Sequence, residues 1–393
     1  MSMSNDVISL FSTSEAGFRR LPSPDGATPF IEVDGPRLDR NIKRMQAIAD
    51  DAGVGLRPHI KTHKSIEIAR RQIGAGAVGL TASKASEAEV FVRAGFKDVL
   101  MAYPVIRAEA VGQLLATAKA QDAGVSFIAA DLSGVRALHD AAIAARMRLP
   151  VFVKVDVGLG RIGVKPESAM ALQMAQEIAG ADGLRLAGLL SHAGHSYGAD
   201  RPETIEAIAM AEDRTLEALR QRLESAGIAD LQISTGSTPT ALGAPIFPAT
   251  NEVRPGNYAF LDLTALRLKI ASADDIALSV VATVIAANEA HAIIDAGSKM
   301  LSSDHGPHGT GGGDYGCAVG LDANGVASAF SVARLSEEHG FLALEGRSLP
   351  VGSRVRIFPN HSCAVVALSD SFVMRDGDGG FRTLPIDARG KLT

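Results

Sequence analysis

Apolar residues recur at helical spacing in some stretches of this chain and form short continuous runs in others. The first helical stretch carries Leu38, Ile42, Met45 and Ile48. Their intervals of four, three and three residues predict a helix, and Gly53 follows it as a cap. A second, longer helix is predicted between Ile205 and Gly227 on the same grounds.

Between the helical stretches lie eight apolar runs: Leu56–Ile60, Val78–Ala82, Val99–Tyr103, Val125–Ala129, Val151–Val155, Leu186–Ser191, Leu231–Thr235 and Glu252–Arg254. Runs this apolar are typical of parallel strands that are covered on both faces. Eight such strands with helices between most of them predict an α/β fold, a (β/α)8 barrel over residues 28–262. Because the eighth run is short and polar, a doubly wound open sheet is the alternative.

After residue 262 the pattern changes. The segments LSVVATVIA, HAIIDA, RVRIF and the region around FVMRD are strand-like, and the turn signals DANG, EEHG and RDGDGG separate them. We therefore predict a C-terminal, mainly antiparallel β domain over residues 263–393. An early strand over residues 29–33 is expected to join it. A length of 393 residues agrees with two domains.

Composition excludes several classes of partner. A net charge of -5 and an aromatic content of 5%, with no Trp, argue against a nucleic-acid or anionic-membrane partner. No run approaches the ~20 apolar residues that a membrane-spanning helix needs. Two cysteines are too few for a disulfide framework, and the N-terminus lacks a signal-peptide pattern, so we expect a cytoplasmic protein.

The first polar cluster that suggests chemistry is Arg57-Pro58-His59-Ile60-Lys61, at the end of the first predicted strand. In an extended segment Arg57, His59 and Lys61 share one face. Function in a (β/α)8 barrel gathers at the C-terminal ends of the strands. Burial there would favour a neutral Lys61, which is a nucleophile toward carbonyl groups. The alternative is a solvent-exposed lysine at a strand end.

Two loops after the seventh and eighth strands are candidates for a phosphate site. Gly236, Ser237 and Thr238 follow one strand directly, and hydroxyl and backbone N–H groups at a helix start bind phosphate oxygens. Tyr258 follows the next strand, in Arg254-Pro255-Gly256-Asn257-Tyr258, and could donate to the same phosphate. Barrel phosphate sites are often formed by these two loops.

Two further strand ends carry a cation and an imidazole. Arg161 closes Asp156-Val157-Gly158-Leu159-Gly160-Arg161 and is expected to approach the ring of a cofactor. His192, in Ser191-His192-Ala193-Gly194-His195, could hold Arg161 or pack against that ring. For His192 a purely structural hydrogen-bonding role is the alternative.

In the β domain, His361 and Cys363 are two residues apart in PNHSC. On an extended segment their side chains point to the same side, and imidazole with thiolate is a natural pair for Zn²⁺. Two protein ligands are fewer than a structural zinc site uses, so the pair favours a catalytic metal. A buried, unliganded Cys363 is the alternative.

Together these motifs resemble the fold-type III pyridoxal-phosphate enzymes of the alanine racemase type. Within that group they are similar to the family of D-serine dehydratase, D-threonine aldolase and 3-hydroxyaspartate lyases. RPHIKTHKS resembles the segment that carries the cofactor lysine, which places it at Lys61. STGSTPTAL and EVRPGNYAFLDL look like the phosphate loops, and SHAGHSYG, DIALSVVATVI, AIIDAG, EEHG and PNHSC follow in order. The resemblance runs from about Thr28 to at least Cys363.

The resemblance implies a homodimer that binds pyridoxal 5′-phosphate and a divalent metal (Zn²⁺, Mn²⁺, Mg²⁺ or Co²⁺). The expected cofactor-binding residues are Lys61, Arg161, His192, Gly236, Ser237, Thr238 and Tyr258. The metal falls at His361 and Cys363. Lys61, with His59 beside it, is the expected catalytic residue. Arg161 near the pyridine nitrogen would keep that nitrogen unprotonated, because one cation disfavours another beside it.

The implied reaction is a lyase reaction on small β-hydroxy-D-amino acids. Its dehydratase form converts D-serine or D-threo-3-hydroxyaspartate to a 2-oxo acid and ammonia, and the His-x-Cys pattern favours this form. Retro-aldol cleavage to glycine and an aldehyde, as in D-threonine aldolase, stays open. A racemase would need a second base, for which Tyr315 is a candidate, and a non-catalytic cofactor carrier would not need the β domain.

Overall fold

The structure is a computed structural model that describes residues 27–309, 312–321 and 327–393. It consists of two compact units. We call residues 43–256 with 390–393 the barrel unit, and the described residues up to 42 with 257–389 the β unit. The units divide between residues 256 and 257, whereas the sequence-based boundary between 262 and 263 remains a prediction.

The barrel unit is built on a parallel sheet whose strand order is β2-β9-β8-β7-β6-β5-β4-β3. The strands are β2 (Gly55–Leu56), β3 (Leu80–Ala82), β4 (Asp98–Met101), β5 (Gly124–Ala129), β6 (Leu149–Lys154), β7 (Leu184–Leu190), β8 (Gln232–Thr235) and β9 (Glu252–Val253). A parallel bridge between His59 and Thr81 joins the segment after β2 to β3 and closes the ring. The predicted barrel is therefore confirmed, and the open sheet is wrong.

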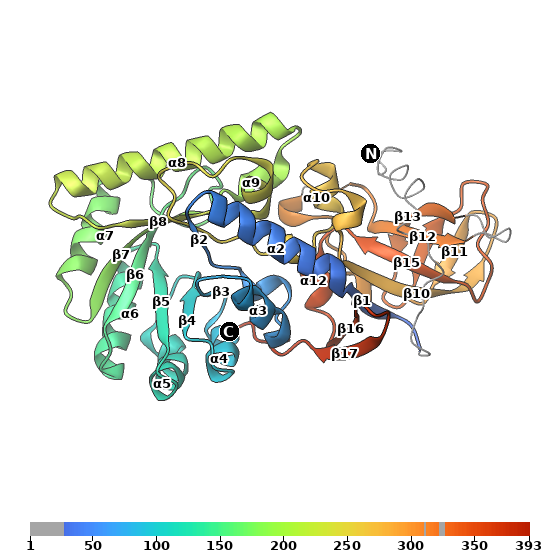
Figure 1. Cartoon of the computed structure of the whole chain (residues 1–393), viewed down its shortest axis with the longest axis horizontal. Coiled ribbons are helices and arrows are strands. Elements are labelled where there is room, and N and C mark those ends of the chain that lie inside the picture. Colours follow the sequence, from blue (N-terminus) through green and yellow to red (C-terminus); the bar gives the residue numbers. More distant parts are fainter. Residues whose placement is uncertain (1–26, 310–311, 322–326) are drawn as a thin grey trace. The chain divides into compact units, whose positions relative to one another are not determined.

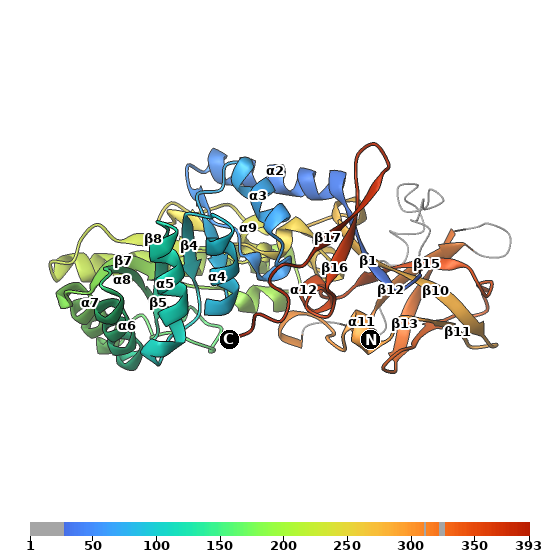
Figure 2. The same ribbon diagram turned by 90° about the horizontal axis from the view of Figure 1, so that it is seen from below.

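Helices lie outside this ring of strands, as Figures 1 and 2 show. They are α3 (Ile66–Gly74), α4 (Ala85–Arg93), α5 (Gly112–Ala120), α6 (Leu132–Ala145), α7 (Ala169–Gly180), α8 (Pro202–Ser225) and α9 (Thr238–Gly243). Because the helices cover one face of the strands and the barrel core the other, Val151, Phe152 and Val153 of β6 are all buried. The two helices predicted from spacing are confirmed as α2 (Gly35–Asp51) and α8.

The β unit contains a mainly antiparallel sheet in the order β11-β14-β13-β12-β15-β10-β1-β16-β17. Its strands are β1 (Phe30–Asp34), β10 (Leu278–Ala287), β11 (His291–Ile294), β12 (Gly316–Leu321), β13 (Ala327–Leu335), β14 (Gly340–Ala343), β15 (Arg354–Pro359), β16 (Ser371–Arg375) and β17 (Phe381–Pro385). A further pairing of β10 with β11 closes six of these strands into a barrel. Its helices are short: α10 (Leu263–Arg267), α11 (Ser298–Leu301) and α12 (Ser362–Val366).

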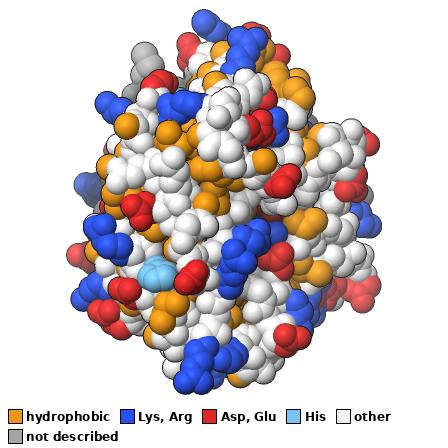
Figure 3. Space-filling view, turned by 90° about the vertical axis from the view of Figure 1, so that its left-hand side faces the viewer, with side chains coloured by type: hydrophobic (Ala, Val, Ile, Leu, Met, Phe, Trp, Pro, Cys, Tyr) orange, Lys and Arg blue, Asp and Glu red, His pale blue; other side chains and the backbone are white. Residues whose placement is uncertain are grey.

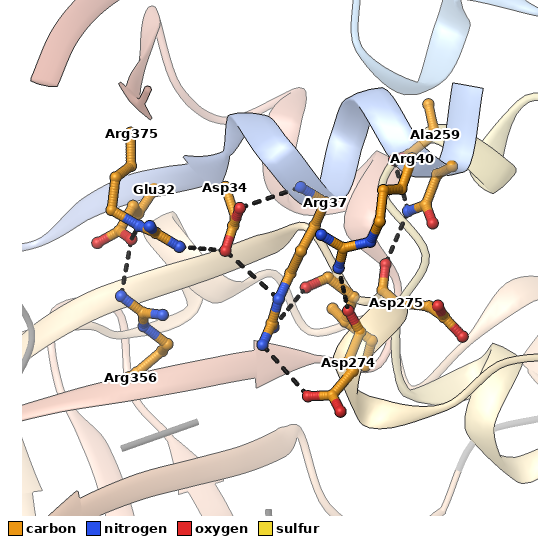
Figure 4. A network of polar contacts seen from close by, with 11 residues as sticks. Glu32, Asp34, Arg37, Arg40, Ala259, Asp274, Asp275, Arg356 and Arg375 are labelled. Carbon is orange, nitrogen blue, oxygen red and sulfur yellow. Dashed lines mark hydrogen bonds and ion pairs between the residues drawn. The ribbon is translucent and has the colours of Figure 1, made fainter. Parts of the chain in front are cut away.

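The early strand β1 joins the β unit as predicted, and an ion-pair network anchors it there (Figure 4). It pairs antiparallel with β10 and parallel with β16. Its buried Glu32 accepts a 2.7 Å bond from Arg356 of β15, and Arg375 of β16 pairs with Asp34. Arg37 of α2 also pairs with Asp34. These contacts hold a strand from the start of the chain inside a sheet built from its last third.

No helix among the described residues is long and apolar enough to cross a membrane. On the face drawn in Figure 3, basic and acidic side chains are interspersed. That distribution agrees with a net charge of only -5.

Candidate active site

Lys61 follows the end of β2 but does not lie on a strand. The strand ends at Leu56, and residues Ile60–Thr62 form a 3₁₀ helix. The backbone turns because the N–H groups of His63 and Lys64 both donate to the carbonyl of Ile60. The expectation that Arg57, His59 and Lys61 share one face of an extended segment is therefore wrong.

Arg57 is held away from this turn. Its Nε donates to Glu252 at 2.7 Å, and its Nη1 pairs with Asp98, also at 2.7 Å. Both carboxylates belong to the first residues of their strands, β9 and β4. These two ion pairs hold the Arg57 guanidinium between the starts of β9 and β4.

Within the segment 60–65, Lys61 alone is exposed. The other members are buried: Ile60, Thr62, His63, Lys64 and Ser65. The expectation that Lys61 is buried is therefore wrong, and Lys61 is the exposed residue of an otherwise buried turn.

Two imidazoles lie within electrostatic range of Lys61. Burial, together with the charges of Lys61 and Arg254, lowers the pKa of His59 well below its usual value. Burial and the charges of Lys61 and Lys154 do the same to the pKa of His192. Both rings are consequently neutral near pH 7. A neutral imidazole can accept a hydrogen bond at one ring nitrogen and donate one from the other.

The Gly-Ser-Thr loop forms the start of α9. Ser237 is the N-cap: its hydroxyl accepts from the Thr240 N–H at 3.3 Å, and its own N–H donates to the Thr240 hydroxyl at 2.9 Å. Gly236 has a φ of +101°, and a Cβ there would lie 3.3 Å from the backbone nitrogen of Arg254. His192 reaches the same loop, with Nδ1 3.4 Å from the Gly236 carbonyl.

Thr238 carries an unsatisfied polar atom. Its buried hydroxyl oxygen has no hydrogen-bond partner among the described residues. A buried hydroxyl without a partner is unfavourable, and a phosphate oxygen would satisfy it. The loop therefore fits the phosphate of pyridoxal phosphate: it offers an unused hydroxyl beside a glycine that brings the backbone close.

A chain of buried polar groups behind His192 was not predicted as part of the site. Ser234 donates to Glu252 at 2.7 Å, and Arg254 Nε donates to Ser234 at 2.7 Å. Arg254 also donates to the Ser191 carbonyl, and the Ser191 hydroxyl donates to Glu212 at 2.5 Å. Burial raises the pKa of Glu212, against the opposing effect of Ser191 and Arg254.

Lys154 is a second lysine that sequence analysis missed. It ends β6, two residues after Phe152, so it lies on the same strand face as the buried cluster of Leu100, Ile128, Phe152, Ala187 and Leu190. Burial and the charge of Arg254 lower the pKa of Lys154 to about 7, although Glu212 opposes this. A charged residue inside the otherwise apolar run Val151–Val155 was the available signal.

Arg161 lies in the loop after β6. Asp156 orders this loop, because its Oδ1 accepts from the N–H groups of Gly158 and Gly160 at 3.1 and 3.0 Å. The Arg161 side chain is exposed, and its charge contributes to the lowered pKa of His192 after burial, Lys61 and Lys154. Arg161 is therefore a cation within electrostatic range of His192, and its approach to the cofactor ring remains a prediction.

In the β unit, His361 and Cys363 meet, although the segment is not extended. His361 is the N-cap of α12 and Cys363 lies in its first turn, so the expectation of an extended pair is wrong. Burial disfavours the charged form of His361, but Cys363 and the hydrogen bond that the imidazole donates to Asp304 outweigh burial and raise the pKa of His361 to about 10. The imidazole thus faces anionic groups.

This pair fits two ligands of a metal site. Imidazole and thiolate side by side are suitable donors for Zn²⁺ and related ions. Among the described residues no group of three or more His, Cys, Asp or Glu side chains is arranged to hold a metal. The expectation of two protein ligands, with water or substrate in the other positions, remains a prediction.

The residue between the two candidate ligands anchors them. The Ser362 N–H donates to Asp262 at 3.0 Å, and its hydroxyl donates to Asn257 at 2.5 Å. Asn257 donates in turn to Asp262 at 2.7 Å. Tyr258, next to Asn257, is buried, and its predicted contact with the phosphate remains a prediction.

Comparison with known proteins places these features in a family. Residues 33–263 match the alanine racemase N-terminal domain, and residues 277–375 match a putative serine dehydratase domain. A D-threo-3-hydroxyaspartate dehydratase of Delftia sp. (strain HT23) is 35% identical over 91% of this chain and 96% of that enzyme. A D-threonine aldolase of Arthrobacter sp. is 32% identical over 89% of each chain.

A solved structure agrees with the sequence matches. A mutant of D-threo-3-hydroxyaspartate dehydratase in the metal-free form superposes with a TM-score of 0.84 at 33% identity. The match covers 92% of this chain and 97% of that one. The chain therefore belongs to the fold-type III family of pyridoxal-phosphate-dependent lyases that combines an alanine racemase N-terminal domain with a serine dehydratase domain.

Proposed function

We propose that this protein is a lyase that acts on β-hydroxy-D-amino acids and depends on pyridoxal phosphate and a divalent metal. Its preferred reaction is dehydration, with D-serine or D-threo-3-hydroxyaspartate converted to a 2-oxo acid and ammonia. The observation that carries the proposal is the exposed Lys61 on a buried turn, beside two neutral imidazoles, His59 and His192. The dehydratase relative supports the choice of reaction.

We assign the cofactor bond to Lys61 and not to the other two lysines of this region. Lys64 is buried and ion-paired with Glu87 at 2.5 Å. Lys154 is buried at the end of β6 and donates to the Val155 carbonyl at 3.3 Å. Bound pyridoxal phosphate supplies an electron sink that acidifies the Cα–H of the amino acid, and the metal supplies a Lewis acid for the β-hydroxyl.

Each candidate residue then has a role that its surroundings support. Nζ of Lys61 would hold the cofactor, and this amine would also accept the Cα proton of the substrate; acceptance from one face only would select the D-enantiomer. Gly236, Ser237 and Thr238 bind the phosphate, and Arg161 and His192 orient the ring. His361 and Cys363 would hold the divalent metal. Neutral His59 accepts and donates hydrogen bonds beside the amine.

Retro-aldol cleavage is the second candidate. It needs the same lysine and metal ligands, but a base must take the β-hydroxyl proton so that Cα–Cβ breaks. The D-threonine aldolase relative favours this alternative. The aldolase is 32% identical to this chain and the dehydratase 35%, so product analysis, described below, decides between the two reactions.

A homodimer is part of the proposal and follows from the family resemblance. It would be tested by light scattering of the purified protein. The cytoplasmic location also remains a prediction. The proposed substrates are small amino acids, and no part of the proposal requires a nucleic acid or a membrane.

The deciding experiment compares Lys61→Ala with Lys154→Ala. Lys61→Ala should abolish the visible absorbance of lysine-bound cofactor, whereas Lys154→Ala should retain it. The reaction is then identified by product analysis with D-serine, D-threonine and D-threo-3-hydroxyaspartate beside their L-enantiomers. Ammonia and a 2-oxo acid from a D-substrate support the dehydratase. Glycine and an aldehyde would make the protein an aldolase, and an unchanged Lys61→Ala spectrum would refute the lysine assignment.

A further inference from the structure

The turn that carries Lys61 is tied to the neighbouring barrel loop by one buried carboxylate. Glu87 belongs to α4 and its side chain is fully buried, with 0% exposed. Its Oε1 lies 2.5 Å from Nζ of Lys64, in the loop after β2. Its Oε2 accepts from the Ser83 N–H at 2.6 Å, in the loop after β3. A single side chain thus connects the loops that follow two adjacent strands.

Lys64 also shapes the turn through its backbone. Its φ is +51°, in the left-handed region that L side chains rarely adopt. In that conformation its N–H closes the turn by donating to the Ile60 carbonyl at 2.8 Å. A non-glycine residue in this region persists only where its surroundings hold it, and the ion pair with Glu87 is the strongest such contact of Lys64.

The remaining residues of the turn are fastened in other ways. His63 accepts from the Ser65 N–H at 3.0 Å and bonds Gln72 at 3.2 Å. Gly256 packs so closely that a Cβ there would lie 2.9 Å from the Thr62 hydroxyl. These contacts hold Thr62 and His63, the two residues that follow Lys61. The Lys64–Glu87 pair connects the turn to the loop after β3.

We propose that Lys64 and Glu87 are positioning residues: their buried ion pair holds the turn so that Nζ of Lys61 is aimed at the cofactor carbonyl. The inference rests on the proposed function of Lys61 and adds two residues that the cofactor does not need for binding its phosphate. Loss of the pair should therefore slow formation of the bond to Lys61 and leave phosphate binding intact.

The test uses the double variant Lys64→Met/Glu87→Gln, which removes both charges and leaves an amide oxygen for the Ser83 N–H. Replacing a buried ion pair by neutral groups of similar size is often close to neutral for stability. We expect an unchanged melting temperature. The rate constant of cofactor attachment, followed by absorbance, should fall about 10- to 100-fold, as misplacement of a reacting group does elsewhere. The dissociation constant of pyridoxamine phosphate, which cannot bond to lysine, should stay unchanged.

Two controls sharpen the result. Lys64→Arg keeps the charge and should retain most of the rate. Glu67→Gln removes the partly exposed i,i+4 pair of Glu67 with Arg71 on α3 and leaves the Lys64–Glu87 pair intact, so this variant should attach the cofactor at the wild-type rate. A folded double variant that attaches pyridoxal phosphate at the wild-type rate would overturn the inference. If the double variant does not fold, a wild-type rate in Glu87→Asp, whose carboxylate is withdrawn by one methylene, overturns it equally.

Borohydride reduction and peptide mass mapping separate this inference from the proposed function. In the wild-type protein the phosphopyridoxyl group should be found on Lys61. A label on another lysine would overturn the proposed function and this inference together. A label on Lys61 with an unimpaired double variant would overturn the positioning role alone.

Discussion

Asp304 holds the imidazole of His361, with Oδ2 2.7 Å from Nδ1. The Asp304 carboxylate is itself oriented, because its Oδ1 accepts from the Gly306 N–H at 2.9 Å. A carboxylate on one ring nitrogen sets which nitrogen carries the proton and leaves Nε2 to bind a metal.

Asp304→Asn should therefore weaken metal binding about 10- to 100-fold, as loss of such supporting groups typically does. Metal content after dialysis against a graded chelator series would measure the change. Glu338→Gln, which removes the exposed pair with Lys299, is the control and should bind metal normally. Wild-type affinity in Asp304→Asn would show that the His361 orientation does not depend on this carboxylate.

The unsatisfied hydroxyl of Thr238 gives a second prediction. Thr238→Val keeps the shape of the side chain and removes a buried oxygen that has no partner among the described residues, so stability should not fall. Affinity for pyridoxamine phosphate should drop about tenfold, or about 1.4 kcal/mol, because a bond to a charged phosphate is lost.

Thr240→Val is the matched contrast, because Thr240 forms the capping box with Ser237. It should lower the melting temperature as well as the affinity. The Thr238 prediction fails if Thr238→Val binds the cofactor as tightly as the wild-type protein.

Acid sensitivity should depend on His63. The Ser65 N–H donates to its Nδ1, so that nitrogen is unprotonated, and burial lowers the pKa of His63 to about 3. Between pH 6.5 and 3 the unfolded chain binds a proton that the folded chain does not. The contribution is fully present above pH 6.5 and decreases as the pH falls, by about 2 kcal/mol between pH 6.5 and 5.

His63→Asn, whose amide oxygen can accept from the Ser65 N–H, should be less stable at pH 7 but lose less stability on acidification. Urea unfolding at pH 7 and pH 5 would measure both quantities. His339→Asn, at an exposed position, should keep the wild-type acid response. If His63→Asn and the wild-type protein lose the same stability between pH 7 and pH 5, His63 is not the cause of the acid sensitivity.

The network around Glu32 should dominate the stability of the β unit. Arg356→Met leaves a buried carboxylate without its 2.7 Å partner, and breaking one member of such a pair costs about 3 to 5 kcal/mol. Adding Glu32→Gln should recover much of that loss, since no charge is then stranded. Urea unfolding of the single and double variants would measure it.

Arg382→Gln is the control, because its partly exposed pair with Asp376 should contribute about 1 kcal/mol or less. If the double variant is no more stable than Arg356→Met, charge compensation is not the reason for this network.

The regular elements of the barrel unit were predictable because their signals are local. Most of the parallel strands are short apolar runs, and α2 and α8 show the spacing of a helix with one buried face. In the β unit, β10, β11, β15 and β16 were predicted, whereas β12, β13, β14 and β17 were not. The missed strands are rich in small or polar residues, as in GCAVGL and FRTLP. Pairing with neighbouring strands stabilises them, and their own residue pattern does not identify them as strands.

The sequence alone predicts those candidate site residues that are neighbours in the chain: Lys61 in its motif, Gly236 to Thr238 after a strand, and His361 with Cys363. The groups that support these residues become visible only in the folded chain, because the two partners of each contact are distant in sequence. Glu87 reaches Lys64 across 23 residues and Asp304 reaches His361 across 57. The turn at Lys61 replaced the predicted strand for the same reason, since buried contacts of Thr62, His63 and Lys64 with other segments outweigh the local preference for extension.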